Sequence, residues 1–166
     1  IVKAKLTQGC PGGETSPALS YAVLNKGPAF QPAGLPLLQS LKPSPRMPVL
    51  FVGHGSPMNA IEDNAWRRSW QAMGSELMAR AVQPQLILCV SAHWLTRGGW
   101  QITGMASPKT IHDFGGFPQE LFDQQYPAPG APAVARSLAA ELQSPATGKA
   151  LGVDESEWGL DHGTWS

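Results

Sequence analysis

The stretch Val49–Pro57, VLFVGHGSP, places a histidine between two glycines directly after a run of apolar residues. A short apolar run that ends at glycine predicts a buried strand followed by a tight loop. Because the flanking glycines have no Cβ, the backbone can turn sharply and bring His54 close to a ligand. Leu86–His93, LILCVSAH, repeats the pattern of an apolar run that ends at a histidine. Together they predict two strand ends that present His54 and His93.

The segment between these two stretches predicts a helix from about Asn64 to Ala81, with Asp63 or Asn64 as its cap. Its apolar residues recur at spacings of three and four and form one stripe that we expect to pack on the sheet. The members of this stripe are Trp66, Trp70, Met73, Leu77 and Ala81. With a second strand at Gln85–Val90, the order strand, helix, strand predicts parallel strands joined by a right-handed crossover. Ligands gather at the carboxyl ends of such strands, where His54 and His93 stand.

The second half of the chain continues with both kinds of element. Residues 100–105 alternate and predict a strand, and residues 107–126 predict a long loop with one helical turn at 119–124. A helix is expected at 133–142, with Pro132 in its first turn, followed by a short strand at 149–153. The fold expected is therefore α/β, with a mixed and largely parallel central sheet flanked by helices.

Composition excludes several classes of protein. The 166 residues carry no formal net charge and only 14% charged residues, which argues against a broad nucleic-acid surface. No window approaches the roughly 18 apolar residues needed to span a bilayer. Cys10 and Cys89 do not make a disulfide framework, which favours a reducing compartment. We therefore expect a cytoplasmic protein with no nucleic-acid or membrane partner.

Residues 1–46 differ in composition from the rest of the chain. They hold seven prolines, five Lys or Arg and a single acid, whereas all six tryptophans and all four histidines lie in residues 47–166. Prolines and glycines at this density predict a mostly disordered or loosely attached lead. We expect the native domain to begin near Met47, with the lead an artefact of expression or of the gene boundary; a proline-rich docking arm is the alternative.

The four histidines are the candidates for chemistry. Imidazoles at the ends of buried strands suit metal ligands, which favours a metal bound by His54 and His93. His112 and His162 each neighbour an aspartate, but neither shows the spacing of a zinc finger or of an HExxH helix. For each histidine taken alone, a hydrogen-bonded loop residue is the alternative.

Four segments of this chain resemble the 4,5-DOPA extradiol dioxygenase family. In order they are GHGSPMNAIEDN, SAHW, TIHDFGGFPQELFDQQYPAPG and WGLDHGTW. The resemblance covers about residues 47–166 and leaves out residues 1–46. It implies a class III extradiol ring-cleaving enzyme of mixed α/β fold.

The resemblance also implies a mononuclear non-haem Fe(II) site that is often occupied by Zn(II). Its first ligands would be His54 and His93, and its substrates a catechol and O₂, with the ring opened beside its two hydroxyl groups. A nearby histidine would move protons, and His162 and, less directly, His112 are the candidates. Aromatic residues that would cover the ring are Phe114, Phe117 and Trp94.

Members of this family continue for roughly as many residues again, and that part supplies further metal ligands. The resemblance therefore implies a catalytic domain truncated at its C-terminus, with reduced or absent activity and an apolar sheet face left uncovered. Two other classes of protein remain open. One is a zinc-dependent hydrolase on a similar α/β scaffold, with metal-bound water as nucleophile. The other is a non-catalytic fragment that binds nothing specific.

Overall fold

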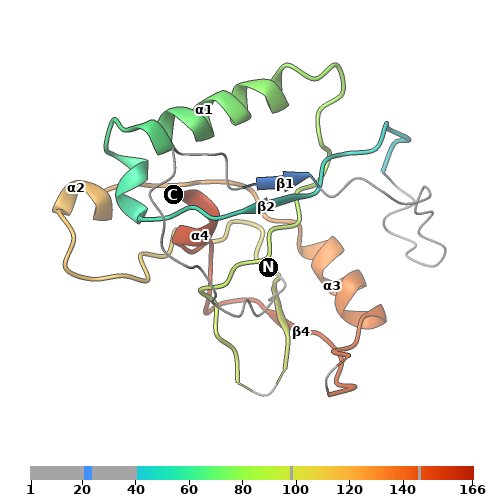
Figure 1. Ribbon diagram of the computed structural model, residues 1–166. Helices are drawn as coiled ribbons and strands as arrows, with labels where there is room; N and C mark the ends of the chain where they lie inside the picture. Colours follow the sequence, from blue (N-terminus) through green and yellow to red (C-terminus); the bar gives the residue numbers. More distant parts are fainter. Residues whose placement is uncertain (1–20, 24–40, 98, 146) are drawn as a thin grey trace. The chain divides into compact units, whose positions relative to one another are not determined.

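The computed structural model describes residues 21–23, 41–97, 99–145 and 147–166 (Figure 1). They belong to two compact units. The smaller unit contains residues 21–23, 43–87 and 166, and the larger unit contains residues 41–42 and 88–165. Each unit has its own short sheet and its own helices, so each is described by itself.

In the smaller unit, strand β2 (Leu50–Val52) pairs antiparallel with β1 (Tyr21–Val23), so that Tyr21 lies opposite Val52. The turn after β2 leads into a short 3₁₀ helix, η2 (Pro57–Ala60), and then into α1 (Ala65–Met78), the long helix labelled in Figure 1. Asn64 caps α1, because its side chain accepts a hydrogen bond from the backbone N–H of Arg67 at 2.9 Å. The helix expected from the sequence is thus confirmed, although it ends three residues before Ala81.

In the larger unit, β3 (Gln101–Thr103) pairs parallel with β4 (Gly152–Asp154), and Ile102 lies opposite Val153. Helix α3 (Pro132–Glu141) packs on this pair and closes a small core. The buried members of that core are Ile102, Ala135, Leu138 and Leu151. The unit also contains two single-turn helices, α2 (Gln119–Phe122) and α4 (His162–Trp165). Proline at the first turn of α3 was expected from the sequence and is confirmed.

The α/β class, with parallel pairing and flanking helices, is confirmed. The strand expected at 100–105 is present as the shorter β3, and the helical turn expected in the long loop is present as α2. The strand expected at 149–153 lies slightly later, at β4. Among the described residues no helix has both the length and the apolar composition needed to cross a bilayer.

The expected strand–helix–strand unit is wrong in one element. Residues 85–90 form no strand, and Ile87 and Leu88 are 78% and 56% exposed. A strand exists only where a neighbour completes its backbone hydrogen bonds, and within the described residues no segment pairs with this one. Strand β2 pairs instead with β1, which lies inside the lead that we expected to be disordered. The remainder of that expectation concerns residues 1–20 and 24–40, which lie outside the described residues.

The stripe on α1 was expected to pack on the sheet, but it is only half-buried. Helix α1 has no buried residue, and the Trp66 side chain is exposed. The apolar spacing therefore predicted the helix correctly, but the apolar face of the helix is not fully buried.

Asp154, at the end of β4, holds the next four residues in place. Its carboxylate accepts hydrogen bonds from the backbone N–H groups of Ser156, Glu157 and Trp158 at 3.1, 2.8 and 2.6 Å. Burial would raise the pKa of Asp154, but these bonds outweigh it and hold the pKa below its usual value. The carboxylate therefore fixes the position of Trp158, which lines the candidate site described below.

We expect Asp154→Ala to lower the free energy of unfolding at neutral pH and to lose most of this effect in acid. Because the folded-state pKa is depressed, the stabilisation is present above the unfolded-state value of about 3.9 and disappears as the pH falls through the folded-state pKa. Urea unfolding of both proteins at neutral pH and below about pH 4 measures the difference. An equal difference at the two pH values would contradict this role.

Candidate active site

The conformation of the GHGSP loop in the smaller unit is fixed by a glycine and by a buried asparagine. Gly55 adopts a φ of +72°, a conformation that favours glycine and that lets the chain reverse after His54. The carbonyl of His54 accepts a hydrogen bond from the buried Asn59 side chain at 2.9 Å, and Asn59 in turn accepts one from Asn64 at 3.0 Å. The residue that caps α1 therefore also anchors the loop of His54.

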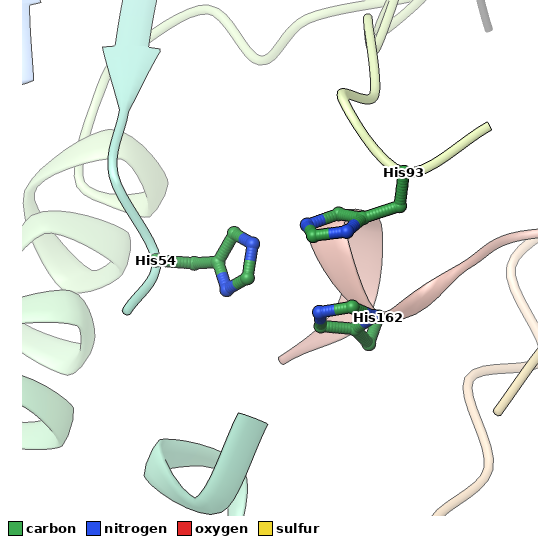
Figure 2. Close-up of side chains that lie close together, drawn as sticks. All are labelled: His54, His93 and His162. Atoms are coloured by element: carbon green, nitrogen blue, oxygen red, sulfur yellow. The ribbon is translucent and has the colours of Figure 1, made fainter. Parts of the chain in front are cut away.

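In the larger unit, His93 and His162 lie against each other. Their ring centroids are 3.9 Å apart, with an angle of 43° between the ring planes. Figure 2 shows the two side chains next to each other. The His162 side chain is buried, whereas that of His93 is about one third exposed. A Cβ at Gly163 would come within 2.6 Å of the His93 ring, so only glycine allows α4 to approach this closely. His54, also labelled in Figure 2, belongs to the smaller unit.

Two loops that are far apart in the sequence run side by side, and one of them leads directly into His162. Thr110 and Leu160 form a parallel bridge, in which Leu160 N donates to Lys109 O and Ile111 N donates to Leu160 O, both at 2.8 Å. Gly159 makes this approach possible, because a Cβ there would clash with the Lys109 carbonyl. The bridge aligns residues 109–113 with residues 160–162.

Asp113 reaches His162 as a consequence of this alignment. Its Oδ1 accepts hydrogen bonds from the backbone N–H of His162 at 3.0 Å and from the ring Nδ1 at 2.8 Å. Its Oδ2 lies 4.0 Å from Nδ1 of His93. Burial would raise the pKa of Asp113, but the two bonds from His162 outweigh it and hold the pKa below its usual value. An ionised carboxylate therefore lies 2.8 Å from Nδ1 of His162 and 4.0 Å from Nδ1 of His93.

A second carboxylate, that of Asp161, ties the SAHW segment to the DHGTW segment. Asp161 is completely buried and accepts hydrogen bonds from Ser91 Oγ at 2.7 Å and from the indole N–H of Trp158 at 3.1 Å. Ser91 Oγ itself accepts the backbone N–H of His93 at 3.1 Å. The chain on both sides of the histidine pair is thus fixed through a single buried group.

An open cavity of about 740 Å³ adjoins His93. Two tryptophans from its lining, Trp94 and Trp158, stack in parallel with ring centroids 6.2 Å apart. The lining also contains Arg97 and Glu157, so that aromatic rings and charged groups of both signs surround the space. A cavity with aromatic walls beside an imidazole suits a small aromatic molecule.

His112 lies in an aromatic cluster next to this pair. Its Nε2 is 2.9 Å from the carbonyl oxygen of Gln124, and its ring contacts Phe114, Phe122 and Trp165. Phe114 also meets the ring of His162 edge-on, with centroids 5.5 Å apart. The Phe114 ring therefore contacts both His112 and His162.

The residues present fit a borderline divalent metal. Neutral imidazole is the ligand that Fe(II) and Zn(II) both accept, and a carboxylate hydrogen-bonded to the far nitrogen is the usual support of a metal-site histidine. Within the larger unit, His93 supplies such an imidazole, and it lies against His162, which the Asp113 carboxylate supports. Within the smaller unit, the fixed GHGSP loop carries the imidazole of His54.

The histidines themselves were predicted from the sequence, but their carboxylate partners were not. Asp113 follows His112 and Asp161 precedes His162, yet Asp113 contacts His162 and Asp161 contacts Ser91 and Trp158. Of the three aromatic residues expected to cover a substrate ring, Trp94 lines the cavity and Phe114 packs on His162. The third, Phe117, packs on Phe114. The sequence does show two adjacent His-Asp pairs, which indicate that aspartates lie near the histidines. It does not show which aspartate contacts which histidine.

The chain belongs to the family described as the catalytic LigB subunit of aromatic ring-opening dioxygenase, whose profile matches residues 48–166. This confirms the family resemblance. Among curated proteins, the chain is 55% identical over 122 residues to a 4,5-DOPA dioxygenase extradiol of Escherichia coli (strain K12), a match that covers 74% of this chain and 42% of the relative. It is 35% identical over 115 residues to the protein of the same name from Beta vulgaris, covering 69% of this chain and 41% of the relative. The chain thus spans about two fifths of the length of these relatives.

Proposed function

We propose that the protein opens the ring of a catechol with O₂ at a divalent metal bound by His54 and His93. Family membership supports the class of reaction, and the contact between His93 and the buried, carboxylate-supported His162 is the structural observation that carries the proposal. Fe(II) is the proposed metal, and Zn(II) would be bound by the same ligands. A metal held by these residues would bring the catechol and O₂ together and activate them for reaction.

In the proposed reaction both oxygen atoms enter the product. The carbon–carbon bond beside the two hydroxyl-bearing carbons breaks, the O–O bond breaks, and two carbon–oxygen bonds form. The catechol supplies all the electrons that O₂ accepts, so no further reductant is required. The chain's own groups must therefore orient the ring and move the protons of its hydroxyl groups.

We assign proton transfer to His162. Its ring is buried against His93, and a ring nitrogen in that position can take a proton from a hydroxyl group of a substrate beside His93. His112 is the second candidate, although its Nε2 is close to the Gln124 carbonyl. Trp94 and Trp158 would bind the flat face of the ring and exclude water from it.

The proposal is tested by loading protein with Fe(II) without oxygen, adding a catechol, admitting air and recording the yellow ring-opened product. Two proteins are compared: the present chain, and a chimaera in which Ser166 is followed by the part of the Escherichia coli relative beyond its matched residues. We expect colour from the chimaera and weaker colour or none from the chain alone, because two or three imidazoles leave the metal incompletely coordinated.

The control is the same chimaera loaded with Zn(II), which has no redox chemistry and should give no colour. A folded, Fe(II)-loaded chimaera that consumes no O₂ with any catechol would overturn the proposal. Ester hydrolysis by the Zn(II) form, in the absence of ring opening, would instead assign the site to a hydrolase.

A further inference from the structure

Asp113 contacts His162 through a single carboxylate oxygen that takes two donors. Oδ1 accepts from the backbone N–H at 3.0 Å and from ring Nδ1 at 2.8 Å, so the main chain and the side chain of His162 are both fixed by it. Both side chains are nearly buried, with 11% of Asp113 and 9% of His162 exposed. Water therefore competes little for these bonds.

The direction of the ring bond follows from the chemistry of the acceptor. A carboxylate has no hydrogen to donate, so Nδ1 of His162 must carry the hydrogen. In the neutral ring the lone pair then belongs to Nε2. His93 and Phe114 are among the groups that contact the His162 ring from other segments, and neither is a carboxylate.

We propose that Asp113 is a positioning residue, which holds His162 in the Nδ1–H tautomer and in one ring orientation so that Nε2 is the basic atom of the site. The same arrangement, a carboxylate on the far nitrogen of a working histidine, sets the tautomer in catalytic triads and in metal sites. The catalytic consequence rests on the proposed function, whereas the tautomer does not depend on it.

The first test measures the tautomer directly. In the metal-free chain with ¹⁵N-labelled histidine, two-bond ¹H–¹⁵N spectra at about pH 8, above the ordinary histidine pKa, report which nitrogen carries the hydrogen. We expect the Nδ1–H form for His162 in the unsubstituted chain. In Asp113→Ala we expect His162 to change to the Nε2–H form, which free histidine prefers. Asp123→Ala, at an exposed aspartate after α2, is the matched control and should leave the spectrum of His162 unchanged.

The proposal is overturned if His162 is Nε2–H in the unsubstituted chain, or if a folded Asp113→Ala keeps Nδ1–H. Should circular dichroism show that Asp113→Ala is unfolded, Asp113→Asn takes its place, since its amide oxygen can still accept hydrogen bonds. A mixture of tautomers is then expected, because the neutral amide oxygen is a weaker acceptor than the carboxylate and favours the Nδ1–H form less. An undiminished Nδ1–H signal would reject the proposal.

The second test uses the Fe(II)-loaded chimaera. Asp113→Asn should lower kcat about 10–100-fold, the size of effect usual for groups that orient a working histidine, with KM little changed. An unaltered kcat would contradict the positioning role. If the unsubstituted chimaera has no ring-opening activity, the proposed function fails, while the tautomer measurement still decides the role of Asp113.

Discussion

Replacing His93 with alanine is expected to lower the affinity of the chain for a divalent metal by about 100-fold or more. Changes in groups that only orient ligands typically cost about 10–100-fold, so loss of a ligand should cost at least as much. His93 is the expected ligand because it lines the cavity and its ring lies against that of His162. Anaerobic calorimetric titration with Fe(II), and with Zn(II) as a redox-inert probe, measures the affinity.

The matched comparison is His112→Ala, which also removes one imidazole. Its ring packs among aromatic side chains beside the Gln124 carbonyl, so the substitution should leave metal affinity nearly unchanged. His54→Ala should behave like His93→Ala if His54 is the second ligand. Equal affinities of the His93→Ala and His112→Ala chains would show that the metal is bound elsewhere.

Removal of the Asp161 carboxylate should destabilise the chain more than any other single substitution at the site. Asp161→Ala leaves the Ser91 hydroxyl and the Trp158 indole N–H buried without their acceptor. Leaving a buried donor without its acceptor costs about 1–3 kcal/mol for each group. Urea unfolding followed by tryptophan fluorescence measures the change and also reports on Trp158.

Two variants calibrate this result. Asp161→Asn keeps one acceptor oxygen and should lie between the unsubstituted chain and Asp161→Ala. Asp63→Ala removes an exposed aspartate that forms an ion pair with Arg68, and such a surface pair is worth about 0–1 kcal/mol. A loss in Asp161→Ala no larger than that in Asp63→Ala would contradict the structural role of the buried network.

Local signals in the sequence predicted the elements that depend on local interactions. Asn64 at the start of α1 and Pro132 at the start of α3 act within one helical turn, and both helices formed where they were expected. The apolar run at residues 85–90 failed as a strand because a strand depends on a distant partner. For the same reason the pairing of β2 with β1 had no signal near β2 itself.

In the candidate site, too, features that depend on neighbouring residues were predicted from the sequence, and contacts between distant segments were not. The glycines beside His54 predicted a sharp turn, and Gly55 does adopt a positive φ. The close approach of Gly163 to His93 was not predicted. The approach of Asp113 to His162 depends on the bridge between Thr110 and Leu160, fifty residues apart in the sequence. Neither residue type is distinctive at that bridge, so only the three-dimensional structure reveals the partner.

The most direct test of the central proposal is to carry out the reaction of the Fe(II)-loaded chimaera under ¹⁸O₂ and weigh the product. Extradiol ring opening predicts a product with both labelled atoms and with the carbon–carbon bond broken beside the two hydroxyl groups. His93→Ala in the same chimaera should yield none of it. A product without any labelled atom, or one cleaved between the two hydroxyl groups, would contradict the function proposed for this protein.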